Sequence, residues 1–172
     1  MKDFSWFEKR ELIVKDNSFR LLSNRFLDKS RKNMITLNIL SEINDNPKVR
    51  EILKIPNSYN ADEWIVISGY YAMYSSALAL LAKIGYKSKN HTATIVALEK
   101  FYLKKDLLSK EDLHLLKHAS IKKEEIEELS EARKDREIAQ YSITKQTTKN
   151  IAIRVKVDAK NFLDKCEEIL MK

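Results

Sequence analysis

Glycine, proline and cysteine are scarce in this chain of 172 residues, which contains two glycines, two prolines and one cysteine. Sheet-rich folds need many tight turns, and such turns draw heavily on glycine and proline. Their scarcity therefore favours a few long helices. Leu, Ile, Lys, Glu and Ala, which are mostly good helix formers, make up much of the remainder.

The single cysteine, Cys166, excludes an internal disulfide and a cysteine-based zinc site. It lies at an apolar position of the last helical segment, so we interpret it as a thiol of the core or of an interface rather than as a nucleophile. A lone thiol agrees with the reducing cytoplasm. The first residues, MKDFSWFEKRE, carry charge from residue 2 and include no apolar signal segment, which also favours a cytoplasmic protein.

Several common catalytic motifs are missing. The chain contains no phosphate-binding glycine loop, DxD, HExxH or GxSxG. We therefore expect no metal and no cofactor. His114 and His118 lie four residues apart on one predicted helix, but two imidazoles without a third ligand are too few for a metal site, and we interpret them as surface or helix-end residues. The carboxylates of residues 124–131 alternate with lysines and leucines as on a solvated helix face.

One uncharged run, from Trp64 to Ala82, is long enough to consider as a membrane span. Tyrosines and serines lie near its middle, where a spanning helix prefers Leu or Val. We therefore predict a helix buried by other helices, and no membrane partner. Its small residues allow close approach of a neighbouring helix or of a second subunit: Gly69, Ala72, Ser75, Ser76 and Ala79.

Apolar residues recur at helical spacing along most of the chain. Residues 1–17 are weakly patterned and predict an N-terminal arm or a short helix. Residues 18–172 predict one all-α, up-and-down helical bundle of about five principal helices. The expected helical ranges are 18–43, 48–54, 60–84, 91–103, 109–119, 122–141 and 149–171, with a polar connection at 86–90 and a polar break at 144–148.

Local signals define several helix ends. Ser18 and Asn90 are plausible N-caps. Gly85 suits the position after a helix where positive φ is needed. The run from Ser109 to Asp112 has the spacing of a capping box.

The chain carries 32 Lys and Arg residues against 25 Asp and Glu residues, a net charge of +7. A basic surface favours polyanions such as RNA through counterion release. A lysine-rich proteome explains the same excess, and charge alone does not separate the two explanations.

Two segments carry a resemblance to a known family. The first reads YYAMYSSALALLAKIGY from Tyr70 to Tyr86 and is followed by a short link to His91. The second reads ARKDREIAQY from Ala132 to Tyr141. Together, in this order, they resemble the HEPN family, whose members show a helix like YYAMYxxAxALLxxxGY, a link to a histidine, and a later arginine followed within a few residues by histidine or tyrosine.

The resemblance implies a HEPN-like helical bundle, usually a homodimer whose polar motifs face the dimer groove. Many members are metal-independent ribonucleases. Several are toxins of toxin–antitoxin modules whose antitoxin is a small nucleotidyltransferase, and others bind nucleotides without evident catalysis. Arg136 matches the family arginine, and Tyr141 stands where active ribonucleases carry histidine.

Metal-free RNA cleavage needs a base, an acid and a cation that stabilises the phosphorane charge. Arg136 suits the phosphate contact because its guanidinium is planar and bidentate. Tyr141, with an ordinary tyrosine pKa near 10, is a poor base at neutral pH. It can instead orient a phosphate, stack on a base, be modified by a nucleotidyltransferase partner, or pack on the bundle.

Three further residues are candidates for RNA or nucleotide binding. His91 either completes the groove or only begins a helix capped by Asn90. Tyr71 either packs in the core or reaches the same groove with its hydroxyl. Arg133 either adds a second phosphate contact or pairs with Glu137 at i, i+4. Two hypotheses follow: an RNA- or nucleotide-binding protein with ribonuclease toxin activity, or a catalytically silent interaction or nucleotide-binding module.

Overall fold

The computed structural model describes residues 3–135 and 141–172, apart from the side chains of residues 122, 124–135 and 141–148. The described residues form seven α-helices, two 3₁₀ helices (η) and one two-stranded sheet, which confirms the predicted all-α helical bundle. In chain order the elements are α1 (Phe4–Lys9), β1 (Ile13–Lys15), η1 (Asn17–Leu22), α2 (Ser23–Asp45), α3 (Pro47–Ile52), α4 (Asp62–Lys83), β2 (Tyr86–Ser88), α5 (His91–Phe101), η2 (Leu103–Lys105), α6 (Lys110–Asp135) and α7 (Tyr141–Met171).

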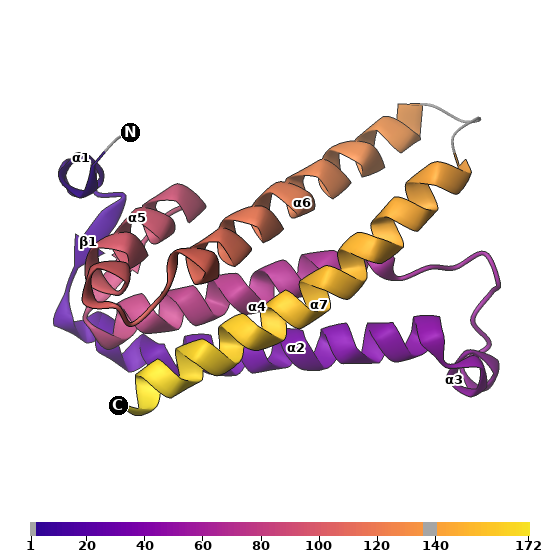
Figure 1. Cartoon of the computed structure of the whole chain (residues 1–172), viewed down its shortest axis with the longest axis horizontal. Helices are drawn as coiled ribbons and strands as arrows, with labels where there is room; N and C mark the ends of the chain where they lie inside the picture. Colours follow the sequence, from indigo (N-terminus) through magenta and orange to yellow (C-terminus); the bar gives the residue numbers. More distant parts are fainter. Residues whose placement is uncertain (1–2, 136–140) are drawn as a thin grey trace.

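Helix α4 lies at the centre, with α2 packed along it and α7 crossing it (Figure 1). Buried serines join α2 to α4: Ser30 Oγ lies 2.7 Å from both the Ala72 carbonyl oxygen and Ser76 Oγ. Further along, Ser23 Oγ donates to the Ala79 carbonyl at 3.0 Å. Buried hydroxyls require such partners. Three of the small residues predicted to allow close approach, Ala72, Ser76 and Ala79, therefore contact a helix of the same chain.

Gly69 lies where α2 and α7 both approach α4. A Cβ at this position would be 2.4 Å from Val155 Cγ1 of α7 and 3.2 Å from Leu37 Cδ1 of α2. Any larger residue must therefore displace the Val155 side chain or move α7. The buried face of α7 follows the predicted stripe, and it places Val155, Phe162 and Cys166 in the core. Cys166 is fully buried in the core, one of the two predicted alternatives, and this burial raises the pKa of its thiol.

Among the described residues one helix, α4, has the length and hydropathy to cross a membrane. The rest of the protein buries 78% of its most apolar 18-residue window. This burial is what the sequence predicts for a helix surrounded by other helices.

The N-terminal segment packs on the turn that follows α4. Strand β1 pairs antiparallel with β2, with Ile13 opposite Ser88. Asp16 N–H donates to the Gly85 carbonyl at 2.9 Å, and Gly85 has the predicted positive φ, +79°. Residues 86–88 therefore form a strand, where the sequence predicted only a polar connection. The pairing partner lies some seventy residues earlier, so no local pattern reveals it.

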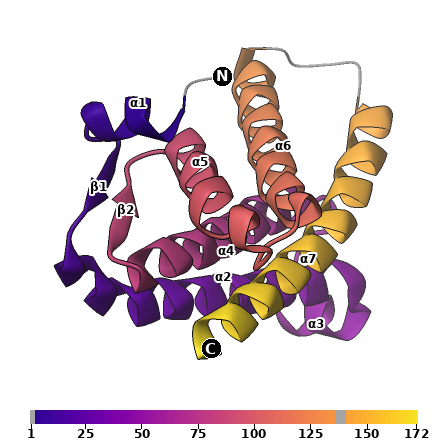
Figure 2. The same ribbon diagram turned by 60° about the vertical axis from the view of Figure 1, so that its left-hand side comes forward.

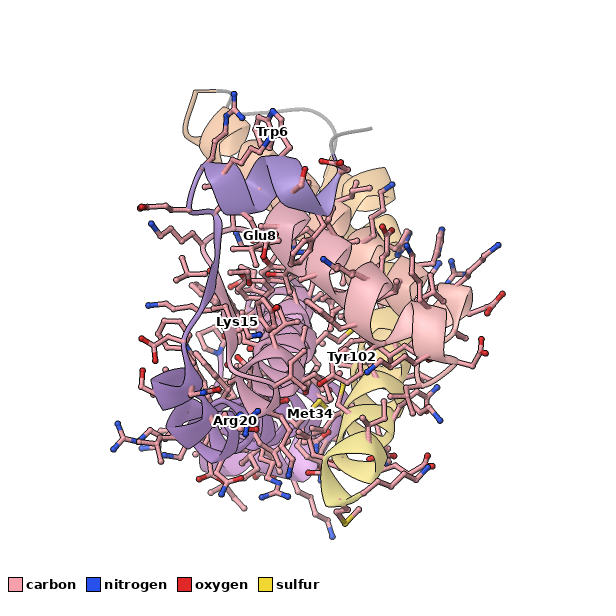
Figure 3. All side chains as sticks on the ribbon, turned by 90° about the vertical axis from the view of Figure 1, so that its left-hand side faces the viewer. Trp6, Glu8, Lys15, Arg20, Met34 and Tyr102 are labelled. Carbon is pink, nitrogen blue, oxygen red and sulfur yellow. The ribbon has the colours of Figure 1, made fainter. Side chains whose placement is uncertain are left out.

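An aromatic contact fastens α1 to this region. The ring of Phe4 lies 5.2 Å from that of Phe101, centroid to centroid, in an edge-to-face arrangement. Figure 3 looks onto this side, with Trp6 on α1 at the edge of the protein and Tyr102 inside it. The Tyr102 hydroxyl donates to the Leu80 carbonyl at 2.6 Å, and burial raises its pKa.

Several predicted boundaries were wrong. Asp16, not Ser18, caps the 3₁₀ helix η1, and α2 begins only at Ser23. The ranges 109–119 and 122–141 were predicted as separate helices, but residues 110–135 form one helix, α6. The polar break predicted at 144–148 lies within α7. Polar and β-branched residues lower helix propensity by well under about 1 kcal/mol each, so such runs do not end a helix.

Two predicted caps are confirmed. Asn90 Oδ1 accepts from Ala93 N–H at 2.8 Å, so Asn90 begins α5. Ser109 N–H donates to Asp112 Oδ2 at 2.8 Å, and Asp112 N–H donates to Ser109 Oγ at 3.0 Å, which is the reciprocal pattern of a capping box at the start of α6.

Gly69→Ala is expected to destabilise the protein. Overpacking costs about 1–3 kcal/mol, while alanine gains about 1 kcal/mol in helix propensity. We expect the difference, a net loss of up to about 2 kcal/mol, in a urea titration. The added Val155→Ala substitution should recover part of this loss by removing the methyl that clashes, as a double-mutant cycle measures. Strict additivity of the two changes would contradict the contact.

Candidate functional site

An aromatic cluster with basic groups occupies the junction of α4, α5 and α6. It consists of Tyr70, Tyr71, Tyr74, His91 and Lys123. The rings of Tyr70 and Tyr74 stack with centroids 5.7 Å apart and an angle of 8° between their planes. They lie four residues apart on α4, which places them on one helix face.

His91, the first residue of α5, packs against these tyrosines. Its ring centroid lies 5.9 Å from the centroid of Tyr70 and 5.9 Å from that of Tyr74. Asn90 caps the helix here, and the Thr94 hydroxyl one turn later lies 3.5 Å from the Tyr74 hydroxyl. The position of the imidazole is thus fixed by both helices.

Lys123 comes to the cluster from α6. Its Nζ lies 5.5 Å from the ring centroid of Tyr70 and 5.7 Å from that of Tyr71, within the range of a cation–π interaction. Figure 2 shows α5 and α6 standing side by side over α4, where this cluster lies. A cation beside aromatic rings suits a ligand that carries both a flat base and a phosphate.

The tyrosines of the cluster differ in exposure. Tyr70 is 7% exposed and belongs to the core, whereas Tyr71 is 39% exposed. Core packing of Tyr71, one of the two predicted alternatives, is therefore wrong. An exposed aromatic ring beside a lysine is available to a ligand, and the buried ring of Tyr70 packs against it.

Both ring nitrogens of His91 are buried. A proton carrier must reach the proton it transfers. In this conformation the imidazole contributes packing and positions the tyrosines, and direct proton transfer to RNA would require the ring to move.

The structure brings Tyr71 and His91 to one cluster, where the ring of each packs against Tyr70. Arg133 lies on α6 ten residues beyond Lys123, about 15 Å further along the helix axis, and its side chain is not among those described. Arg136 lies outside the described residues. Tyr141 is the first residue of α7, and its side chain is likewise not described. The roles of these three residues stay predictions.

Sequence analysis missed Tyr70, Tyr74 and Lys123 as site residues. The spacing of the two tyrosines was a usable signal, because residues four apart on a helix are neighbours. No comparable signal marks Lys123, one of many lysines on a charged helix.

The two histidines that lie four residues apart can now be placed. His114 and His118 face each other with ring centroids 6.1 Å apart, within α6 rather than at its end. Among the described residues, no group of three or more His, Cys, Asp and Glu side chains is placed to hold a metal ion.

A scan against family models gives no match to this chain, and comparisons with curated proteins and with solved structures give none either. The resemblance to the HEPN family stays a prediction from its motifs.

The two adjacent tyrosines should respond very differently to truncation. Tyr70→Ala removes a buried ring that stacks on Tyr74, and we expect a loss of about 3–5 kcal/mol. Tyr71→Ala removes an exposed ring, and we expect about 1 kcal/mol or less. Chemical denaturation of both variants measures the difference, and equal losses would contradict the assignment of core and surface.

Proposed function

We propose that this protein is a HEPN-like protein that binds RNA or a nucleotide, and that the aromatic cluster forms part of the binding surface. The observation that carries the proposal is the exposed ring of Tyr71 beside Lys123, held by three packed helices. An exposed aromatic ring stacks on a base of any sequence, and a neighbouring cation attracts the phosphate.

The net charge of +7 supports a polyanionic ligand. In the proposal Arg136, with Arg133, contacts phosphate, and Tyr141 orients the phosphate or stacks on a base. The chain acts as a homodimer in the cytoplasm, and as the ribonuclease toxin of a module whose antitoxin is a nucleotidyltransferase. Cleavage in this proposal is metal-independent, with Arg136 stabilising the charge on the phosphorane.

A second candidate function is a catalytically silent interaction or nucleotide-binding module. The buried ring nitrogens of His91 favour it, because they are not accessible for proton transfer. Tyr141 in the place of a histidine favours it as well, because an ordinary tyrosine is protonated at neutral pH and makes a poor base. Binding and cleavage therefore need separate measurements.

RNA binding should depend on Tyr71. Loss of one stacked base costs about 1–3 kcal/mol, so Tyr71→Ala should weaken binding of a single-stranded oligonucleotide roughly 5- to 150-fold. Tyr59→Ala is the matched control, because Tyr59 is also 39% exposed and lies on the loop before α4. Fluorescence anisotropy measures both. Equal affinity of the two variants would exclude the cluster from the binding surface.

Cleavage, if catalysed by this chain, should depend on Arg136 and persist in EDTA. We expect Arg136→Ala to lower the rate at least about 100-fold, since removing one group that stabilises transition-state charge costs that much. Arg25→Ala, an exposed arginine of α2, removes the same charge elsewhere. Light scattering on these samples should give the mass of a dimer.

Absence of cleavage by wild-type protein that still binds RNA would favour the silent module. A monomer would exclude a groove shared between two subunits.

A further inference from the structure

A pocket lies at the opposite end of α4 from Gly85, between the end of α2, the start of α4 and the side of α7. Its volume is about 340 Å³, and its walls include Asn44, Asp62, Ile65 and Ile153. A second hollow of similar volume adjoins it and shares Asn44, Asp45, Asp62 and Lys149. Neither includes a residue of the aromatic cluster, so this pocket is separate from the proposed RNA surface.

Asp62 lines this pocket and is only 4% exposed. Its Oδ1 accepts from Asn44 Nδ2 at 2.8 Å, and its backbone N–H donates to Asn60 Oδ1 at 2.7 Å. Asn44 Oδ1 in turn accepts from Ala61 N–H at 2.9 Å. The carboxylate is thus oriented by Asn44, whose own side chain is held by the backbone of Ala61.

The second carboxylate oxygen, Oδ2, is buried without a hydrogen-bond partner among the described residues. A buried carboxylate oxygen without a partner is costly, and native proteins retain such a group where something else completes it. The missing partner is a hydrogen-bond donor, because an ionised carboxylate only accepts.

The rest of the pocket limits what can supply that donor. Ile65, Ile153 and Val157 provide apolar walls, which suit a flat or aliphatic body. Lys149 and Lys156, two turns apart on α7, line the same pocket and suit an anionic group. A metal ion alone does not fit, since these lysines repel it. Free phosphate does not fit either, since Asp62 repels it.

We propose that this pocket binds a guanine mononucleotide. Guanine presents two adjacent N–H donors, N1–H and the 2-amino group, which match the two oxygens of one carboxylate. Because Oδ2 is buried in the unliganded chain, binding requires a small shift of the pocket wall that uncovers this oxygen. Oδ1 keeps a second lone pair after accepting from Asn44. The base lies between the apolar walls, and the phosphate lies against Lys149 and Lys156. Adenine presents one donor, its 6-amino group, next to an acceptor, N1. In the same position N1 would face a carboxylate oxygen, and two acceptors repel each other.

Calorimetric titration of the whole chain tests the proposal with guanosine monophosphate, adenosine monophosphate and inorganic phosphate as probes. We expect guanosine monophosphate to bind one per chain, adenosine monophosphate at least tenfold more weakly, and phosphate not measurably. Asp62→Asn should weaken binding of guanosine monophosphate at least tenfold, because the amide replaces one acceptor by a donor. The asparagine side chain keeps an oxygen that accepts from Asn44, so the melting temperature of the variant should not fall.

Controls separate this pocket from the aromatic cluster. Asp28→Asn, which changes an exposed carboxylate of α2 outside the pocket, should leave binding of guanosine monophosphate unchanged. Asp62→Asn should leave RNA binding unchanged. If Asp62→Asn does not fold, Lys156→Ala and Val157→Trp are tested in its place. Each should weaken binding of guanosine monophosphate, Lys156→Ala by removing a contact to the phosphate and Val157→Trp by filling the pocket.

Three results would overturn the proposal: no binding of guanosine monophosphate by the wild type, equal binding of the two nucleotides, or unchanged affinity in the folded pocket variants. The last would place the nucleotide elsewhere on the protein. If the chain binds guanosine monophosphate but not RNA, the proposal of this nucleotide site is unaffected.

Discussion

The close packing of α2 and α7 against α4 is the constraint on which the rest of the structure depends. Gly69 leaves no room for a side chain between Val155 and Leu37, and buried serine hydroxyls bond directly to α4 carbonyls nearby. Hydrogen bonds at this depth are satisfied only while the helices keep their register. The position of α4 therefore determines where its two ends and its exposed face lie.

Both candidate sites use this central helix in different ways. The middle of α4 presents Tyr70, Tyr71 and Tyr74 to α5 and α6, and its first residue, Asp62, faces the pocket beside α7. Sites built on packed helices hold their geometry better than sites on loops. One rigid element thus supports a surface suited to an extended polyanion and a pocket suited to a small molecule, on separate parts of the protein.

Local chemistry made some features predictable from the sequence. Three such features depend on residues within a few positions of each other: the positive φ of Gly85, the capping box from Ser109 to Asp112, and the apolar stripe of α7. The strand at 86–88 depends on residues 13–15, and the unpartnered oxygen of Asp62 depends on how α2 meets α4. Tyr71 and Tyr70 share one motif, yet only tertiary packing decides which ring is buried.

The order of synthesis gives the packing around Gly69 a further consequence. Helix α4 is complete long before Val155 and Phe162 of α7 leave the ribosome, and the pair Arg31–Glu167 joins residues 136 positions apart. Until then the α7-facing side of the most apolar helix is uncovered. Contacts between such distant residues slow folding, and uncovered apolar surface promotes aggregation. The nascent chain therefore passes through a stage in which the α7-facing side of α4 is exposed to solvent.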